Sequence, residues 1–78
     1  TMTNTEIFTK VQAIIADQLD QTPDAVQLTT NFKNDLDADS LDVFEIINEI
    51  EDAFDITIDT DETIATVQDL VGFIAKAA

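Results

Sequence analysis

The stretch from residue 39 to residue 54 sorts its apolar and acidic residues at helical spacing. The apolar residues recur every three or four positions, at Val43, Ile46, Ile47, Ile50 and Phe54. The acidic residues also recur every three or four positions, at Asp39, Asp42, Glu45, Glu49 and Asp52. Because an α-helix turns once in about 3.6 residues, these spacings predict an amphipathic helix with an apolar and an acidic face. Asp39 or Ser40 is expected to cap its start. Leu41 and Phe44 lie off the core face and are expected to be partly exposed.

A second helix is predicted at the beginning of the chain, followed by a long loop. Thr3 with Glu6 three residues later is a capping-box pattern. Apolar residues at helical spacing follow it, so we expect a helix over about 4–19. Residues 20–38 have no clean period and contain turn-forming residues, which predicts a loop. Four apolar side chains are expected to hold this loop against the core: Val26, Leu28, Phe32 and Leu36.

A third main helix is predicted near the end of the chain. Thr66 is expected to cap it, with Asp69 at its third position. Its inward-facing residues are expected to be Leu70, Val71, Ile74 and Ala77. Gly72 in its interior weakens the helix by about 1 kcal/mol relative to alanine. Before it, residues 55–60 are expected to form an extended connector, and about 60–65 permits one short helix.

These elements together predict an all-α fold. We expect a small up-and-down-like four-helix bundle with three main helices, one short third helix and a long first loop. The 78 residues are expected to form a single domain, 1–78. Thr1, ahead of Met2, is interpreted as a non-native remnant before a native start.

The charge of the chain limits what it can bind. There are 17 acids against three lysines, a net charge of −14, and every charged residue between Lys33 and Lys76 is acidic. Such a surface repels nucleic acid and anionic membranes and attracts basic protein patches. We therefore expect basic partner proteins, no nucleic acid, no stable membrane insertion and a monomer. A cytoplasmic location is the default expectation, since no export signal or apolar span is visible.

The acidic loop before the central helix could be interpreted as a calcium site. Asp35, Asp37 and Asp39 occupy the first, third and fifth positions of an EF-hand loop. The sixth position should be glycine and is Ser40, and the twelfth should be glutamate and is Ile46. A second cluster around residues 55–61 fails in the same way. We expect no dedicated metal site, and a calcium-binding regulator remains a secondary alternative.

Ser40 has three possible roles. It could be a nucleophile, but the chain has no histidine, and its lysines are distant in sequence from Ser40. It could be a simple helix cap, which is the common use of serine at this place. It could instead be modified by another enzyme, since a helix N-terminus favours a phosphate group. The acidic face without lysine partners costs free energy, which suggests a binding partner that offsets it.

At these residues the chain resembles the acyl carrier proteins, whose signature is D-S-L at the start of the second helix, after an acidic loop and before an acidic helix. Here it reads "DLDADSLDVFEIINEIEDAFDITI". The resemblance implies that Ser40 receives a 4′-phosphopantetheine arm from coenzyme A, transferred by a Mg²⁺-dependent phosphopantetheinyl transferase. The arm's thiol would carry acyl chains as thioesters to enzymes of fatty acid biosynthesis, so the chain itself would not be an enzyme. A polyketide or specialised-lipid carrier is the alternative.

The resemblance also implies a surface for partners. Five acids match residues that meet basic patches on partner enzymes: Asp39, Asp42, Glu45, Glu51 and Asp52. Leu41 and Phe44 match apolar residues that flank the arm. Two positions depart from the family's pattern. Asp37 replaces a usual glycine, which indicates that this backbone does not need a conformation open to glycine alone, and Asn48 replaces an exposed apolar residue.

Overall fold

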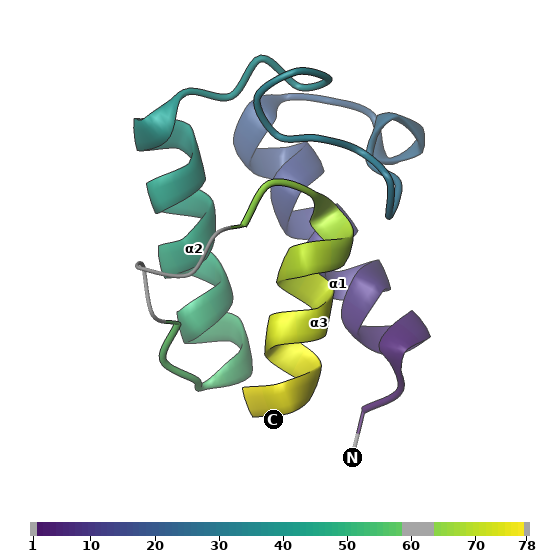
Figure 1. The fold of residues 1–78 in the computed structure, drawn as a ribbon, viewed down its shortest axis with the longest axis vertical. Helices are drawn as coiled ribbons and strands as arrows, with labels where there is room; N and C mark the ends of the chain where they lie inside the picture. Colours follow the sequence, from purple (N-terminus) through teal and green to yellow (C-terminus); the bar gives the residue numbers. More distant parts are fainter. Residues whose placement is uncertain (1, 59–63, 78) are drawn as a thin grey trace.

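The computed structural model describes residues 2–58 and 64–77, and within these ranges the fold is an all-α bundle (Figure 1). Three α-helices are present there: α1 (Asn4–Leu19), α2 (Ser40–Phe54) and α3 (Val67–Ala77). A single 3₁₀ turn, η1 (Pro23–Ala25), interrupts the long loop. α1 packs against both α2 and α3. The all-α prediction and the three main helices are therefore confirmed.

The predicted short helix at about 60–65 falls mainly on residues 59–63, which lie outside the described residues. Its last two positions, Ile64 and Ala65, are not helical. Asp55, the first residue of the expected extended connector, is instead a turn with a left-handed backbone at the end of α2. Residues 56–58 are neither helix nor strand, and residues 59–60 lie outside the described residues.

The core forms where the apolar faces of the three helices meet. Each helix contributes fully buried side chains at four-residue spacing: Ile7, Val11 and Ile15 from α1, Ile46 and Ile50 from α2, and Leu70 and Ile74 from α3. The long loop adds Val26, Phe32 and Leu36, as predicted. A domain this small gains most of its stability from such burial, at roughly 25 cal/mol per Å² of apolar surface.

Two residues expected in the core lie outside it. Leu28 is 41% exposed. Its backbone carbonyl accepts a hydrogen bond from the amide of Gln68 (2.9 Å), so the backbone at Leu28 ties the loop to α3. Ala77 is exposed in the last turn of α3, beyond Ile74, the last buried residue.

Side chains cap both terminal helices as the sequence predicts. Thr3 and Glu6 form a reciprocal capping box at the start of α1. Thr66 Oγ1 accepts from the amide of Asp69 (3.2 Å), and the Asp69 carboxylate accepts from the amides of Ala65 and Thr66 (both 3.1 Å). These caps satisfy amides that would otherwise lack a partner at a helix start.

The caps also set two pKa values. The amide of Thr3 holds the pKa of Glu6 below its ordinary value of 4.5, and the amides of Ala65 and Thr66 hold the pKa of Asp69 below 3.8. In each case the folded chain favours the ionised carboxylate. Both contributions to stability are therefore present above the unfolded-state pKa and are lost as the pH falls through the lower folded-state pKa.

Hydrogen bonds tie the long loop to the start of α3. Thr30 O accepts from the amide of Val67 (3.0 Å), and the amide of Phe32 donates to Ala65 O (3.1 Å). Asn31 and Thr66 form an isolated antiparallel bridge between these bonds. The loop thus crosses the end of the bundle at which α2 begins, opposite the two chain termini (Figure 1). These bonds between the loop and the start of α3 determine which residues lie next to the first turn of α2.

Gly72 gives a direct test of how α3 is stabilised. It is exposed, its φ is not positive, and a Cβ added there would have no atom within 4 Å. We expect Gly72→Ala to raise the free energy of unfolding by about 1 kcal/mol, because alanine is the better helix former and nothing obstructs its methyl group. Urea unfolding followed by circular dichroism measures the change.

The matched control is Ala75→Gly, at an exposed position in the same helix. It should lose a similar amount, about 1 kcal/mol. If Gly72→Ala instead left the free energy of unfolding unchanged or lowered it, the view that Gly72 limits the stability of α3 would be wrong.

Candidate functional site

Ser40 is the first residue of α2, and its side chain is exposed. The helix cap is its neighbour Asp39, which settles the choice left open by the sequence. Asp39 Oδ1 accepts from the amide of Asp42 (2.9 Å), and Asp42 Oδ2 accepts from the amide of Asp39 (3.2 Å). Within the described residues, no hydrogen bond involves the Ser40 hydroxyl, so it is free for another purpose.

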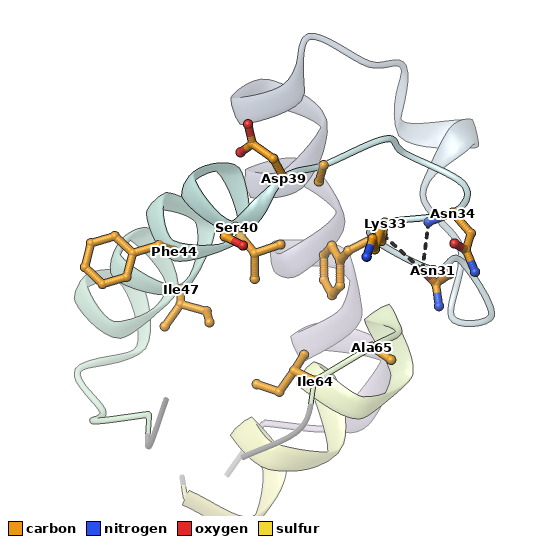
Figure 2. A pocket seen from close by; sticks show the side chains of 12 residues that line it. Asn31, Lys33, Asn34, Asp39, Ser40, Phe44, Ile47, Ile64 and Ala65 are labelled. Carbon is orange, nitrogen blue, oxygen red and sulfur yellow. Dashed lines mark hydrogen bonds between the residues drawn. The ribbon is translucent and has the colours of Figure 1, made fainter. Parts of the chain in front are cut away.

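A pocket of about 630 Å³ opens beside Ser40 (Figure 2). Its apolar wall includes Phe32, Val43, Phe44, Ile47 and Ile64. Its polar residues come from the loop and the helix start: Asn31, Lys33, Asn34, Asp39 and Ser40. A volume of this size falls in the usual range of small-molecule sites, about 300–1,000 Å³. The exposed hydroxyl therefore borders a cavity that could accept an apolar chain.

The loop residue Asp37 has a left-handed backbone, with φ at 53°. Glycine adopts this conformation freely, and aspartate tolerates it better than most residues do. The position therefore favours glycine without requiring it, which explains how an aspartate can occupy it. Asp20 and Asp55, which end α1 and α2, have the same conformation.

The first turns of α2 gather several of the predicted partner-binding residues around Ser40. Leu41 is 63% and Phe44 52% exposed, as expected for apolar residues off the core face. Asp42 is half-buried and takes part in the capping box. Glu45 is exposed, and its carboxylate accepts from Gln18 Nε2 of α1 (2.8 Å). These residues form one surface that displays apolar side chains between acids.

The two remaining predicted acids differ in their surroundings. Asp52 is exposed at the far end of α2. Glu51 is half-buried, and its carboxylate accepts from the amide of Ile58 (2.7 Å). Glu51 therefore holds the segment that follows α2 against the helix, a structural role that the sequence pattern does not reveal.

Two carboxylates of the acidic loop, those of Asp35 and Asp39, accept local hydrogen bonds. Asp35 Oδ2 accepts from the amide of Asn31 (2.7 Å), and Asp39 serves as the helix cap. In the part of the chain that the structure describes, no group of three or more acidic side chains is arranged to hold a metal ion. None of the helices in the same part combines the length and apolar character needed to cross a membrane.

Sequence reasoning missed several residues that line the pocket. Lys33, Ile64 and Ala65 come from segments far apart in the chain and meet only because the loop is hydrogen-bonded to the start of α3. No spacing of residues along the sequence indicates that these two segments line one pocket. The nearest signal is that Lys33 is the one base in the long interval between Lys10 and Lys76.

A small helical bundle that presents an unengaged serine at a helix start, beside an apolar pocket, has the layout of a protein that carries a covalently attached group. The comparison with protein families agrees: the family described as "Phosphopantetheine attachment site" matches residues 9–74. The relatives are more specific. The acyl carrier protein of Streptococcus pyogenes serotype M1 is 56% identical over 70 residues, which cover 90% of this chain and 93% of the relative.

Two further comparisons support the same assignment. The acyl carrier protein of Lactococcus lactis subsp. cremoris (strain MG1363) is 52% identical over 68 residues, which cover 87% of this chain and 92% of the relative. A solved structure of the acyl carrier protein from Enterococcus faecalis superposes with a TM-score of 0.80 at 38% identity, and the match covers 99% of this chain and all of that one. The chain belongs to the acyl carrier protein family. It is accordingly a carrier of acyl groups rather than a catalyst, and its prosthetic group is 4′-phosphopantetheine.

Proposed function

We propose that Ser40 is the residue that carries the 4′-phosphopantetheine arm. The observation that carries this proposal is the exposed hydroxyl of Ser40 at the start of α2, which the helix does not use as its cap. Ser40 is also the only serine in the chain. The residues around it fit the group, because an apolar pocket opens beside the hydroxyl and the first turn of α2 is exposed to an approaching enzyme.

The attachment needs an enzyme other than this chain. Ser40 Oγ loses its proton and forms a bond to the phosphorus of phosphopantetheine, while the pyrophosphate bond of coenzyme A breaks and adenosine 3′,5′-bisphosphate leaves. In the described part of the chain, no hydrogen bond joins the Ser40 hydroxyl to a group that could take that proton, and Oδ1 of the neighbouring Asp39 accepts from the amide of Asp42 in the helix cap. The chain's contribution is to present the hydroxyl on a rigid, capped helix start. Once attached, the arm supplies a thiol that holds acyl groups as thioesters.

The pocket beside Ser40 is an observation in favour of the proposed role, which is to deliver acyl chains in fatty acid biosynthesis. Val43, Ile47 and Ile64 give it an apolar wall on the side of the bundle interior. An acyl chain placed there would leave water at a gain of about 0.8 kcal/mol for each buried CH₂ group. The proposed role of these side chains is to shield the chain between visits to partner enzymes.

The partner surface in this proposal is the exposed side of α2. Asp39, Leu41, Asp42, Phe44 and Glu45 surround Ser40, and Asp52 continues the acidic face toward the end of the helix. The proposed partners are the phosphopantetheinyl transferase and enzymes of fatty acid synthesis that present basic patches. In this proposal Glu51 has an indirect role: its carboxylate accepts from the amide of Ile58 and so holds the segment after α2 in place, and it does not contact partners itself. The net charge of −14 makes self-association unfavourable, so the proposed active form is a monomer, working in the cytoplasm with these enzymes.

The test is the direct loading of the purified chain. Incubation with coenzyme A, Mg²⁺ and a phosphopantetheinyl transferase is expected to add the mass of one phosphopantetheine, measured by intact-mass spectrometry. Fragmentation of the product should place the added mass on Ser40. An unchanged mass, or an added mass on a threonine, would contradict the proposal.

A further inference from the structure

The pocket beside Ser40 contains one base, Lys33. The chain has only three lysines. Lys10 lies on α1 with its Nζ 5.7 Å from the centre of the Phe54 ring, at the opposite end of α2 from Ser40. Lys76 lies in the last turn of α3. Lys33 is therefore the one cation that lines the same pocket as the serine (Figure 2).

Lys33 sits on a turn that hydrogen bonds hold in shape. Asn31 Oδ1 accepts from the amide of Lys33 (3.0 Å) and from the amide of Asn34 (2.9 Å). Asp35 Oδ2 in turn accepts from the amide of Asn31 (2.7 Å), and the amide of Asp35 donates to Asn31 O (2.9 Å). The backbone from which the lysine side chain projects is thus fixed.

The same turn is tied to the helix that begins with Ser40. Phe32 O accepts from the amide of Ala38 (2.9 Å), two residues before Ser40, and the amide of Phe32 donates to Ala65 O (3.1 Å). Phe32 itself is buried. These hydrogen bonds join the turn that carries Lys33 to the segment that leads into Ser40, and both residues line the pocket (Figure 2). The flexible stem of the lysine lets its ammonium adjust within that frame.

A negative group on Ser40 would be poorly placed without this cation. Asp39 and Asp42 are its neighbours in the first turn, and Asp37 precedes them in the loop. Their carboxylates already take two amides of the helix start, those of Asp42 and Asp39. A phosphodiester adds one further negative charge to this group. A lysine ammonium is a common partner for such a phosphate.

We propose that Lys33 positions the arm by pairing its ammonium with the phosphodiester on Ser40, across the mouth of the pocket. This inference rests on the attachment proposed for Ser40. The pairing would offset the repulsion from the adjacent acids and direct the start of the arm over the pocket. Lys33 is a positioning residue, and it takes no part in forming the bond.

The test compares the effect of loading in four proteins: the wild type, Lys33→Gln, Lys33→Arg and Lys76→Gln. Each is prepared unloaded and loaded, with loading verified by intact mass, and melted at low salt. We expect loading to lower the melting temperature of Lys33→Gln by about 2–4 °C more than it lowers that of the wild type, the size expected for one ion pair in a domain this small. Lys33→Arg should behave like the wild type because it keeps the charge. Lys76→Gln should also do so, because it removes the same charge far from Ser40.

Two further readouts belong to the same experiment. The difference for Lys33→Gln should fade in about 1 M NaCl, where the screening length is only about 3 Å. The ³¹P resonance of the loaded protein should shift in Lys33→Gln and stay in place in Lys76→Gln. Equal effects of loading on melting in all four proteins, with an unmoved ³¹P resonance, would overturn the role of Lys33 and leave the attachment at Ser40 standing. If no protein gains mass, the attachment itself is wrong, and the role of Lys33 falls with it.

Discussion

The Ser40→Ala variant is expected to fold as the wild type does and to take up no phosphopantetheine. The chain has no other serine, so the transferase loses its only hydroxyl of that kind. Stability should change by less than about 0.5 kcal/mol, because an exposed side chain away from any cap or core contact contributes little. Urea unfolding measures the stability, and intact mass after incubation with coenzyme A, Mg²⁺ and the transferase measures the loading.

Asp39→Ala is the matched variant, since it removes the true cap and leaves the hydroxyl in place. It should lose about 1 kcal/mol of stability, the usual cost of losing an N-cap side chain. It should still gain the arm after long incubation. The pair therefore separates the helix cap from the attachment site. A loss of about 1 kcal/mol in Ser40→Ala would instead mean that the serine itself caps α2, and any loading of Ser40→Ala would place the attachment elsewhere.

The helices could be predicted from the sequence because their signals are local. α1 begins and ends where its capping box and apolar spacing indicate, over Asn4–Leu19. The opposed faces of α2 place Ile46 and Ile50 in the core and leave Leu41 and Phe44 exposed. Spacing along one helix is enough to decide these positions, since it does not depend on which other segment covers the apolar face.

What the sequence could not predict depends on contacts between distant segments. Leu28 is 41% exposed, although its carbonyl accepts from the amide of Gln68 at the start of α3. Glu51 belongs to the acidic pattern of α2, yet its carboxylate binds the amide of Ile58. Lys33 joins the site because its turn is bonded to Ala38 on one side and Ala65 on the other through Phe32. Such backbone pairings have no periodic signature in the sequence.

The acidic face of α2 should lower stability and speed partner binding at the same time. In the triple variant Glu45→Gln, Glu49→Gln and Asp52→Asn, we expect the free energy of unfolding at low salt to rise by about 0.5–1 kcal/mol. These three exposed acids lie three or four residues apart, and each such like-charge pair costs about 0.2–0.5 kcal/mol. Glutamine at position 45 can still accept the hydrogen bond from Gln18. Urea unfolding at low and high salt measures the gain, which should shrink as salt screens the charges.

The same triple variant should associate with the transferase about 10–100 times more slowly at low salt, because the face that steers a basic partner has lost its charge. Stopped-flow association kinetics measure this. The control neutralises three exposed acids elsewhere, in Asp17→Asn, Asp20→Asn and Asp24→Asn, which gives the same net charge without touching α2. If both triple variants slow association equally, steering depends on total charge, and the assignment of the partner surface to α2 is wrong. If only the α2 variant is slow, the acidic face of α2 is the surface that attracts partners. The like-charge repulsion among its acids then has a function, because the same charges that destabilise the free carrier bring its partners to Ser40.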